Sequence, residues 1–191
     1  MVVYMGKNKD FVLSLYQSKS TVFTVNEIAL LLGDSNRDNL KARINYYVRT
    51  GKLLSLRKSI YAKRGYNPLE LAVKVYTPSY VSLETVLERG GVIFQKYETI
   101  FAVSYLSRAI KIDNLQFRYR RIREDILINK EGVELKEGYA IATKERAFLD
   151  VLYLYKNYYF DNLDVLDKDI IREMVKIYKS NALKEKVEEI L

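Results

Sequence analysis

Apolar residues recur at helical spacing in three stretches of the first third of the chain. The first stretch covers residues 8–17 and places its apolar side chains on one face. In the second, Thr24 and Glu27 have the T-x-x-E spacing of a capping box, in which the hydroxyl and the carboxylate each satisfy a free backbone amide. Gly33 is suited to end that helix. These two stretches predict two short amphipathic helices.

A third helix is predicted directly after a tight turn. Ser35 is placed as its N-cap, and the helix is expected to run to Thr50, with Gly51 as its C-terminal stop. Helix, tight turn and helix is the spacing of the DNA-reading helix-turn-helix motif. The residues predicted to share the core face of this third helix are Leu40, Ile44, Tyr47 and Val48.

The opposite face of the third helix carries amide, guanidinium and phenol groups, which suit base edges and phosphates. Arg37 is included because the first turn of a recognition helix points into the major groove. A solvated helix face of the same composition is the alternative. The residues of this segment predicted to contact DNA are Asn36, Arg37, Asn39, Lys41, Arg43, Asn45, Tyr46 and Arg49.

A short β-hairpin is predicted next. Two apolar stretches, residues 53–56 and 60–62, flank the sequence Arg57-Lys58-Ser59. Two cations at a hairpin tip beside a recognition helix can reach the DNA backbone or a narrow minor groove. We therefore predict that residues 1–66 form a winged helix-turn-helix domain that binds double-stranded DNA, with Arg57 and Lys58 as further contacts.

The distribution of charge favours the same interpretation. Of the 191 residues, the first 64 contain twelve basic and four acidic side chains, which accounts for the whole net charge of +8. The remaining residues contain equal numbers of each sign. A basic excess confined to one module indicates a polyanionic partner for that module. An acidic protein surface as the partner of the wing is the alternative.

Residues 67–191 are predicted to form a mixed helix and sheet domain, which makes the whole chain α+β. Short β-branched or aromatic stretches predict a small antiparallel sheet with strands at residues 99–104, 109–112, 115–122, 126–129 and 134–141. Amphipathic periodicity predicts helices at residues 69–76, 82–90, 143–155, 167–179 and 181–191.

Composition excludes several classes of function. The chain has no cysteine and no histidine, so disulfides, thiolate nucleophiles, imidazole bases and cysteine or histidine zinc sites are excluded. It has no long apolar run and no signal-peptide pattern, so we expect a soluble, cytoplasmic protein that does not enter a membrane. No catalytic residue, metal site or cofactor is expected.

A basic strand in the second domain is a candidate second surface for a polyanion or a protein. Its alternation places apolar residues toward the core and arginines outward. An exposed sheet face balanced by Glu124 and Asp125 is the alternative. The basic residues of this segment are Arg118, Arg120, Arg121 and Arg123.

A magnesium-dependent nuclease is the alternative from another class of function. Glu134 and Lys136 have the E-x-K spacing found in many nucleases, downstream of Asp113 and Asp125. No proline precedes either aspartate, so the motif is incomplete.

With these motifs placed, the chain resembles the AbiEi-type antitoxins and their transcriptional-regulator relatives over most of its length. The resemblance is carried by GKLLSLRKSIY at residues 51–61, PSYVSLE at residues 78–84 and ATKERAFLD at residues 142–150. Ser59 and Lys144 depart from the family, which often has glycine and proline at these positions.

This resemblance implies an antitoxin whose winged helix represses its own operon by binding inverted repeats in the promoter. It also implies that the second domain counters a cognate toxin, a nucleotidyltransferase-like protein encoded beside it. A plain winged-helix regulator without a toxin is the alternative within the same family.

Overall fold

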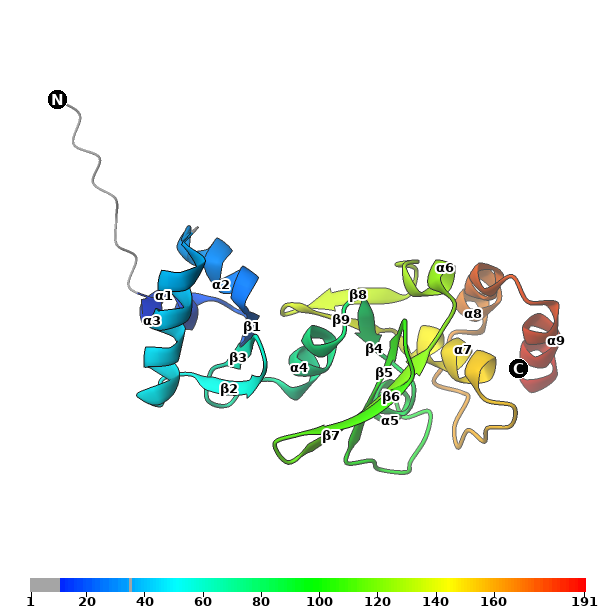
Figure 1. Ribbon diagram of the computed structural model, residues 1–191. Coiled ribbons are helices and arrows are strands. Elements are labelled where there is room, and N and C mark those ends of the chain that lie inside the picture. Colours follow the sequence, from blue (N-terminus) through cyan, green and yellow to red (C-terminus); the bar gives the residue numbers. More distant parts are fainter. Residues whose placement is uncertain (1–10, 35) are drawn as a thin grey trace. The chain divides into compact units, whose positions relative to one another are not determined.

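The computed structural model describes residues 11–34 and 36–191 (Figure 1). Contacts divide the chain into two compact units, the first ending at Asn67 and the second running from Pro68 to Leu191. Both units combine helices and strands, so the predicted α+β class is confirmed. Within the described residues, no helix has the length and apolar character needed to cross a bilayer.

Between residues 11 and 67, leaving out Ser35, the first unit has three helices and a small antiparallel sheet in the strand order β1-β3-β2. Residues from all three helices and from the sheet meet in one apolar core. Its fully buried members include Leu15, Ile28, Leu40 and Ile44. The elements are α1 (Phe11–Gln17), β1 (Val22–Thr24), α2 (Val25–Leu32), α3 (Arg37–Arg49), β2 (Leu54–Arg57) and β3 (Ile60–Ala62).

Two details of the first unit differ from expectation, and two further predictions fall on residues that the structure does not describe. Residues 8–10, predicted to open the first helix, lie outside the described residues, as does Ser35. The side chain that caps α3 is Asn36, whose Oδ1 accepts from the N–H of Asn39 at 3.1 Å. Strand β1 was not predicted, because three residues are too few to show a period.

The second unit is built on a six-stranded sheet, with helices before, between and after its strands. Its elements are α4 (Pro68–Val75), β4 (Ser79–Val81), α5 (Glu84–Arg89), β5 (Thr99–Ser104), β6 (Arg108–Ile112), β7 (Leu115–Arg121), α6 (Glu124–Leu127), β8 (Val133–Lys136), β9 (Tyr139–Ala142), α7 (Lys144–Leu154), α8 (Lys168–Met174), the 3₁₀ helix η1 (Val175–Tyr178) and α9 (Asn181–Ile190).

This sheet is mixed, which corrects the predicted antiparallel arrangement. The strand order is β6-β7-β5-β4-β9-β8, with β5 parallel to β7 and β4 parallel to β9. Parallel pairs need long connections, and β4 and β9 are separated by more than fifty residues. Strand alternation alone carries no information about such distant pairing.

Helices cover both faces of this sheet. Tyr119 of β7 donates its hydroxyl to the carbonyl of Ala72 in α4 at 2.8 Å. Tyr80 of β4 pairs with Val103 of β5, which pairs with Arg120 of β7, so these three side chains point to one face. Tyr119 is next to Arg120 along β7 and therefore points to the opposite face. The hydroxyl of Tyr80 donates to Asp150 of α7. Helices α4 and α7 therefore pack against opposite faces.

Two predicted strands are wrong, and one strand was not predicted. Residues 126–129, predicted as a strand, lie at the end of α6, since a short apolar run does not distinguish a buried strand from one helical turn. Residues 134–141 form the hairpin β8–β9, whose turn residues Glu137 and Gly138 both have positive φ. Strand β4, which begins at Ser79, was not predicted.

Candidate nucleic-acid interface

Helix α2 is capped by side-chain groups at its start and by the backbone of Gly33 at its end. The predicted capping box is present: Thr24 Oγ1 accepts from the N–H of Glu27 at 3.3 Å, and Glu27 Oε2 accepts from the N–H of Thr24 at 2.8 Å. Gly33 ends α2 at φ +65°, a left-handed conformation that glycine adopts without strain. Helix α2 is therefore capped at both of its ends.

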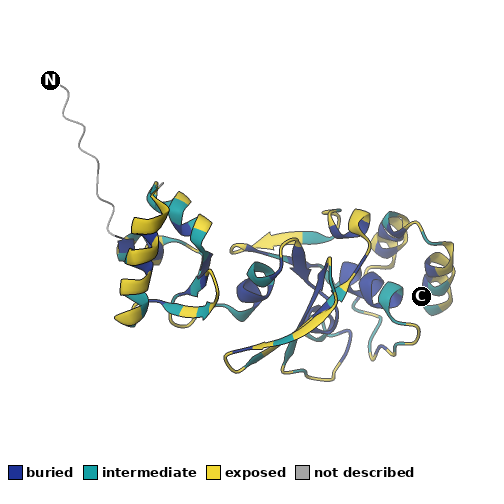
Figure 2. Cartoon of the chain, in the orientation of Figure 1, coloured by how far each residue is buried: buried dark blue, intermediate teal, exposed yellow. Residues whose placement is uncertain are grey.

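Helix α3 has one buried face and one exposed face (Figure 2). Leu40 and Ile44 are fully buried, and Tyr47 and Val48 are half-buried. Most of the predicted DNA contacts lie on the exposed side of this helix and its cap. The exposed residues among them are Asn36, Arg37, Asn39, Lys41, Asn45, Tyr46 and Arg49.

Arg43 differs from the other predicted contacts because it is half-buried and already paired. Its Nη1 donates to Oδ2 of Asp34 at 3.1 Å. Its guanidinium also lies over the ring of Phe11, 5.1 Å from the centroid. Arg43 therefore ties α3 to α1 and to the turn, and its charge is partly neutralised by Asp34.

An aromatic group lies near the C-terminal end of α3. The guanidinium of Arg49 lies 6.0 Å from the ring centroid of Tyr46, which is half exposed. Tyr46 in turn contacts Tyr47 edge-on, and Tyr47 stacks on Phe11. A stacked guanidinium keeps its donors available while losing little side-chain entropy on binding. The pair presents a cation and a phenol on one exposed surface.

The predicted hairpin is formed by β2 and β3, and its tip is polar. Arg57 and Lys58 are both exposed, and Ser59 has φ +64°. The pairing shifts by one residue between Ser55 and Arg57, so Leu56 forms a bulge. A bulge increases local twist and redirects the following side chains, here the two cations of the tip.

Two further cations of the first unit support its framework. Lys63 Nζ donates to the carbonyl of Ser18 at 2.7 Å, just beyond the C-terminus of α1, and lies over the ring of Phe23. Arg64 Nε donates to the carbonyl of Gly51 at 3.2 Å. The net charge of the sequence counts Lys63 and Arg64 in the same way as the exposed cations of α3, although these two side chains bind backbone carbonyls.

A hollow of about 470 Å³ adjoins the start of α3. It is lined by Asn26, Ala29, Leu30, Gly33, Asp34 and Arg37. Leu30 is an apolar side chain that is 82% exposed beside this hollow, on the side of α2 opposite the buried Ile28.

The four arginines of the basic strand do not form one surface, which corrects the prediction. Arg118 and Arg120 project on the face of the sheet that α7 covers, where they lie over the rings of Phe101 and Tyr155, at 5.7 and 4.5 Å. Arg121 alternates to the other face, and Arg123 follows the strand. The sequence run of four cations is thus divided into two pairs.

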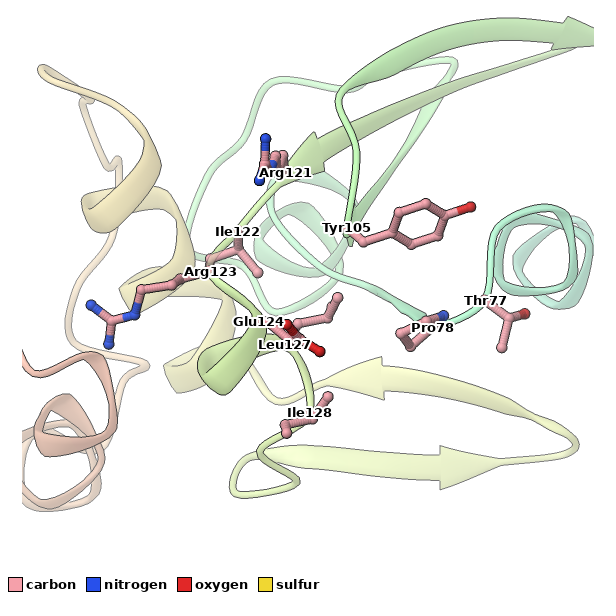
Figure 3. Close-up of a pocket in the computed structure, with 9 residues that line it drawn as sticks. All are labelled: Thr77, Pro78, Tyr105, Arg121, Ile122, Arg123, Glu124, Leu127 and Ile128. Atoms are coloured by element: carbon pink, nitrogen blue, oxygen red, sulfur yellow. The ribbon is translucent and has the colours of Figure 1, made fainter.

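Arg121 and Arg123 border a pocket of about 600 Å³, lined also by Pro78, Tyr105 and Leu127 (Figure 3). The guanidinium of Arg123 points away from Pro78 and binds Asp125, with Nη2 to Oδ2 at 2.9 Å. This hydrogen bonding lowers the pKa of Asp125 to about 2. The charge of Arg123 is thus balanced by Asp125, which agrees for this arginine with the alternative of an exposed face balanced by nearby acids.

Beneath Arg118 and Arg120 lies the buried carboxylate of Glu84. Its Oε1 accepts from the hydroxyl of Tyr155 at 3.1 Å, and its Oε2 has no hydrogen-bond partner among the described residues. Burial raises the pKa of Glu84. Burial and the Glu84 charge also raise the pKa of Tyr155 to about 12.

A fully buried polar cluster lies at the centre of the second unit. The carboxylate of Asp150 accepts from the hydroxyls of Tyr80, Ser82 and Tyr178, at 3.0, 2.8 and 2.7 Å, and from Nε of Arg146. Arg146 also donates to the carbonyls of Ile126 and Glu131. One signal of this cluster is visible in the sequence, because Tyr80 and Ser82 lie in the segment 78–84, and Arg146 and Asp150 lie in the segment 142–150.

The residues of the magnesium alternative are not brought together. Asp113 follows β6 and Glu134 lies in β8, at opposite edges of the sheet, roughly 24 Å apart at the usual strand spacing. Asp125 is occupied by Arg123 and by Lys179, and Lys136 pairs with Glu134 at 3.0 Å. No group of three metal-ligating side chains occurs among residues 11–34 and 36–191.

Comparison with known proteins adds no assignment. No protein-family model matches the chain, and no curated protein matches it either.

Proposed function

We propose that the first unit binds double-stranded DNA as a winged helix-turn-helix, with α3 in the major groove and the β2–β3 hairpin as the wing. The observation that carries the proposal is the exposed side of α3, where amide, phenol and cationic side chains stand opposite the buried Leu40 and Ile44. Such groups suit base edges and phosphates, and the basic excess of this unit supplies the long-range attraction.

Within this proposal the predicted contacts have different roles. Arg37, Asn45 and Tyr46 face the bases, and Lys41 and Arg49 contact phosphates. Arg43 acts as a positioning residue, because Asp34 and Phe11 hold its guanidinium. Arg57 and Lys58 contact the neighbouring backbone or the minor groove.

We further propose that the protein is a transcriptional repressor that acts as an antitoxin, the second unit countering a nucleotidyltransferase-like toxin. This part rests on the resemblance to the AbiEi-type antitoxins. It is supported by the finding that two of the segments that carry the resemblance meet in the buried cluster of Tyr80, Ser82, Arg146 and Asp150. A fully satisfied buried network specifies one arrangement of the core, so the two segments depend on each other for the same fold.

DNA binding is tested by fluorescence anisotropy with a duplex from the protein's own promoter and a scrambled duplex. The double variant Lys41→Ala, Arg49→Ala is expected to lose affinity for both duplexes by at least tenfold. A matched control removes two exposed cations of the second unit, Lys176→Ala and Lys184→Ala, and is expected to bind normally. Equal affinity of both double variants would contradict the proposal.

Salt dependence provides a second readout. About four to six phosphate contacts per copy predict a slope of about −4 to −5 for log affinity against log salt concentration. Replacing Arg57 and Lys58 with alanine is expected to reduce that slope by about 2, if both contact phosphates. A slope near zero for the unmodified protein would overturn the assignment.

The antitoxin role is tested by co-expression with the product of the neighbouring reading frame. We expect that product to arrest growth. We expect the full chain to relieve the arrest, and a variant that lacks DNA affinity to relieve it as well.

The nuclease alternative predicts magnesium-dependent cleavage that is lost in Glu134→Ala. The interaction-module alternative predicts a stable protein complex with no DNA affinity.

A further inference from the structure

The outer strand β8 carries a sequence that is complementary to itself. The six-stranded sheet ends at β8, whose residues read Val-Glu-Leu-Lys. Glu134 and Lys136 lie on one face of the strand and are both exposed, and Leu135 on the other face is 80% exposed. An edge strand presents unpaired N–H and C=O groups with which another strand can pair.

The register of the hairpin shows which backbone groups of β8 face outward. A two-residue turn joins Lys136 to Tyr139, so these two form a hydrogen-bonded pair, as do Glu134 and Ile141 two residues on. The hydrogen bond from the N–H of Thr143 to the carbonyl of Gly132, at 2.8 Å, continues the same alternation. The N–H and the C=O of Leu135 therefore point away from β9, toward the open edge.

We propose that β8 pairs antiparallel with β8 of a second copy of this chain, about a two-fold axis at Leu135. The two Leu135 residues then exchange both N–H···O=C bonds and form a hydrogen-bonded pair. On either side, Glu134 of one copy faces Lys136 of the other, in the non-hydrogen-bonded positions where side chains approach most closely. The sheet becomes continuous across both copies.

Charge selects this edge over the opposite one. Strand β6 carries exposed Arg108 and Lys111 and no acidic residue, so self-pairing there places no acid opposite a base. Like charges across a strand pair destabilise it, whereas opposite charges stabilise it. A second copy therefore fits β8 and not β6.

The pairing is tested by sedimentation velocity of the full chain over a wide concentration range. The mass of one copy is 22.4 kDa, and we expect the average mass to rise toward twice this value with concentration. Glu134→Lys alone and Lys136→Glu alone each place two like-charged pairs in the dimer. Each is expected to weaken self-association by about tenfold.

Mixing the two single variants provides the decisive comparison. In the mixed dimer, residues 134 and 136 of the first variant each face the opposite charge in the second variant. We therefore expect the mixture to associate about as tightly as the unmodified protein, although each variant alone associates more weakly. The double variant that exchanges both charges is likewise expected to dimerise. The matched control Lys111→Glu, the same reversal on β6, is expected to leave self-association unchanged.

Leu135→Pro tests the backbone bond directly. It removes an outward N–H that the β8–β9 ladder does not use, so the hairpin is retained while the dimer is lost. A single copy at every concentration, or a dimer that none of the β8 variants weakens, would overturn the proposal. Because these measurements need no DNA, their failure leaves the DNA-binding proposal standing.

Discussion

The Nε atom of Arg146 lies 3.3 Å from Oδ1 of Asp150, one turn further along α7, and neither side chain is exposed to solvent. The guanidinium also stands over the rings of Tyr80 and Tyr178, whose hydroxyls donate to the same carboxylate. A buried charge is tolerated when it is paired and its remaining hydrogen-bonding groups are satisfied. This pair therefore joins β4, α7 and η1 into one arrangement.

Arg146→Ala is expected to destabilise the second unit by about 3–5 kcal/mol, because it leaves the charge of Asp150 buried without its cation. Urea denaturation followed by circular dichroism measures the change. The control is Arg172→Ala, which removes an exposed ion pair with Glu188 of similar length, 3.2 Å. Its expected cost is below about 1 kcal/mol. Equal costs for the two variants would show that the buried network has no special weight.

Glu84 is expected to make the second unit less stable as pH rises. Its pKa is raised in the folded state by burial, so the folded chain holds the proton more tightly than the unfolded chain. Stability from this group is therefore complete below the unfolded pKa near 4.5 and is lost as pH rises through the raised folded pKa.

The variant Glu84→Gln keeps the acceptor for Tyr155 and removes the charge. We expect it to be more stable than the unmodified protein at pH 7, with a difference that shrinks toward pH 4.5. Unfolding free energies at several pH values provide the measurement, with the exposed Glu98→Gln as control. A difference that is constant with pH would refute the assignment to Glu84.

Gly132 is expected to tolerate no side chain. Its φ is +68°, and a Cβ there would lie 2.8 Å from Cβ of Arg146, which is fixed on α7. Gly132→Ala is expected to cost about 3 kcal/mol from strain and overlap combined. Gly65→Ala, at φ +71° with open space around it, is expected to cost about 1 kcal/mol. A smaller loss at Gly132 than at Gly65, measured by denaturation, would be inconsistent with this packing.

Ser59→Gly is expected to stabilise the first unit by about 0.5–1 kcal/mol. Ser59 has φ +64° at the hairpin tip, where glycine adopts the left-handed conformation without strain. The same replacement at Ser55, in the extended β2, is expected to be destabilising because it loosens the strand. Thermal unfolding of both variants distinguishes strain relief at the tip from a general effect of glycine.

Local signals in the sequence predicted much of the first unit. The Thr24 and Glu27 capping box, the stop at Gly33 and the buried Leu40 and Ile44 are all properties of neighbouring residues, and the structure contains them. The pairing of Arg43 with Asp34 and Phe11 was missed, because α1 contributes to it from more than thirty residues away. Helical spacing assigns a residue to a face but does not identify its partner.

In the second unit the sequence predicted the class but not the arrangement. Strands β5 and β7 were predicted, yet their parallel pairing depends on contacts that no periodicity encodes. The buried cluster was missed because tyrosine, serine, arginine and aspartate are all common on surfaces. Only the fold brings their polar groups close enough to satisfy one another.

The hydrogen bond between Tyr178 and Asp150 also bears on the order of folding. The first unit closes its core within residues 11–62, and its pairing of Val22 with Ala62 spans forty residues. The second unit must bring Tyr80 and Tyr178, almost a hundred residues apart, to the same carboxylate. Closing such a long loop costs conformational entropy before the contacts that compensate for this cost have formed, and this slows folding. The first unit is therefore expected to fold early, and the second only when Tyr178 reaches Asp150.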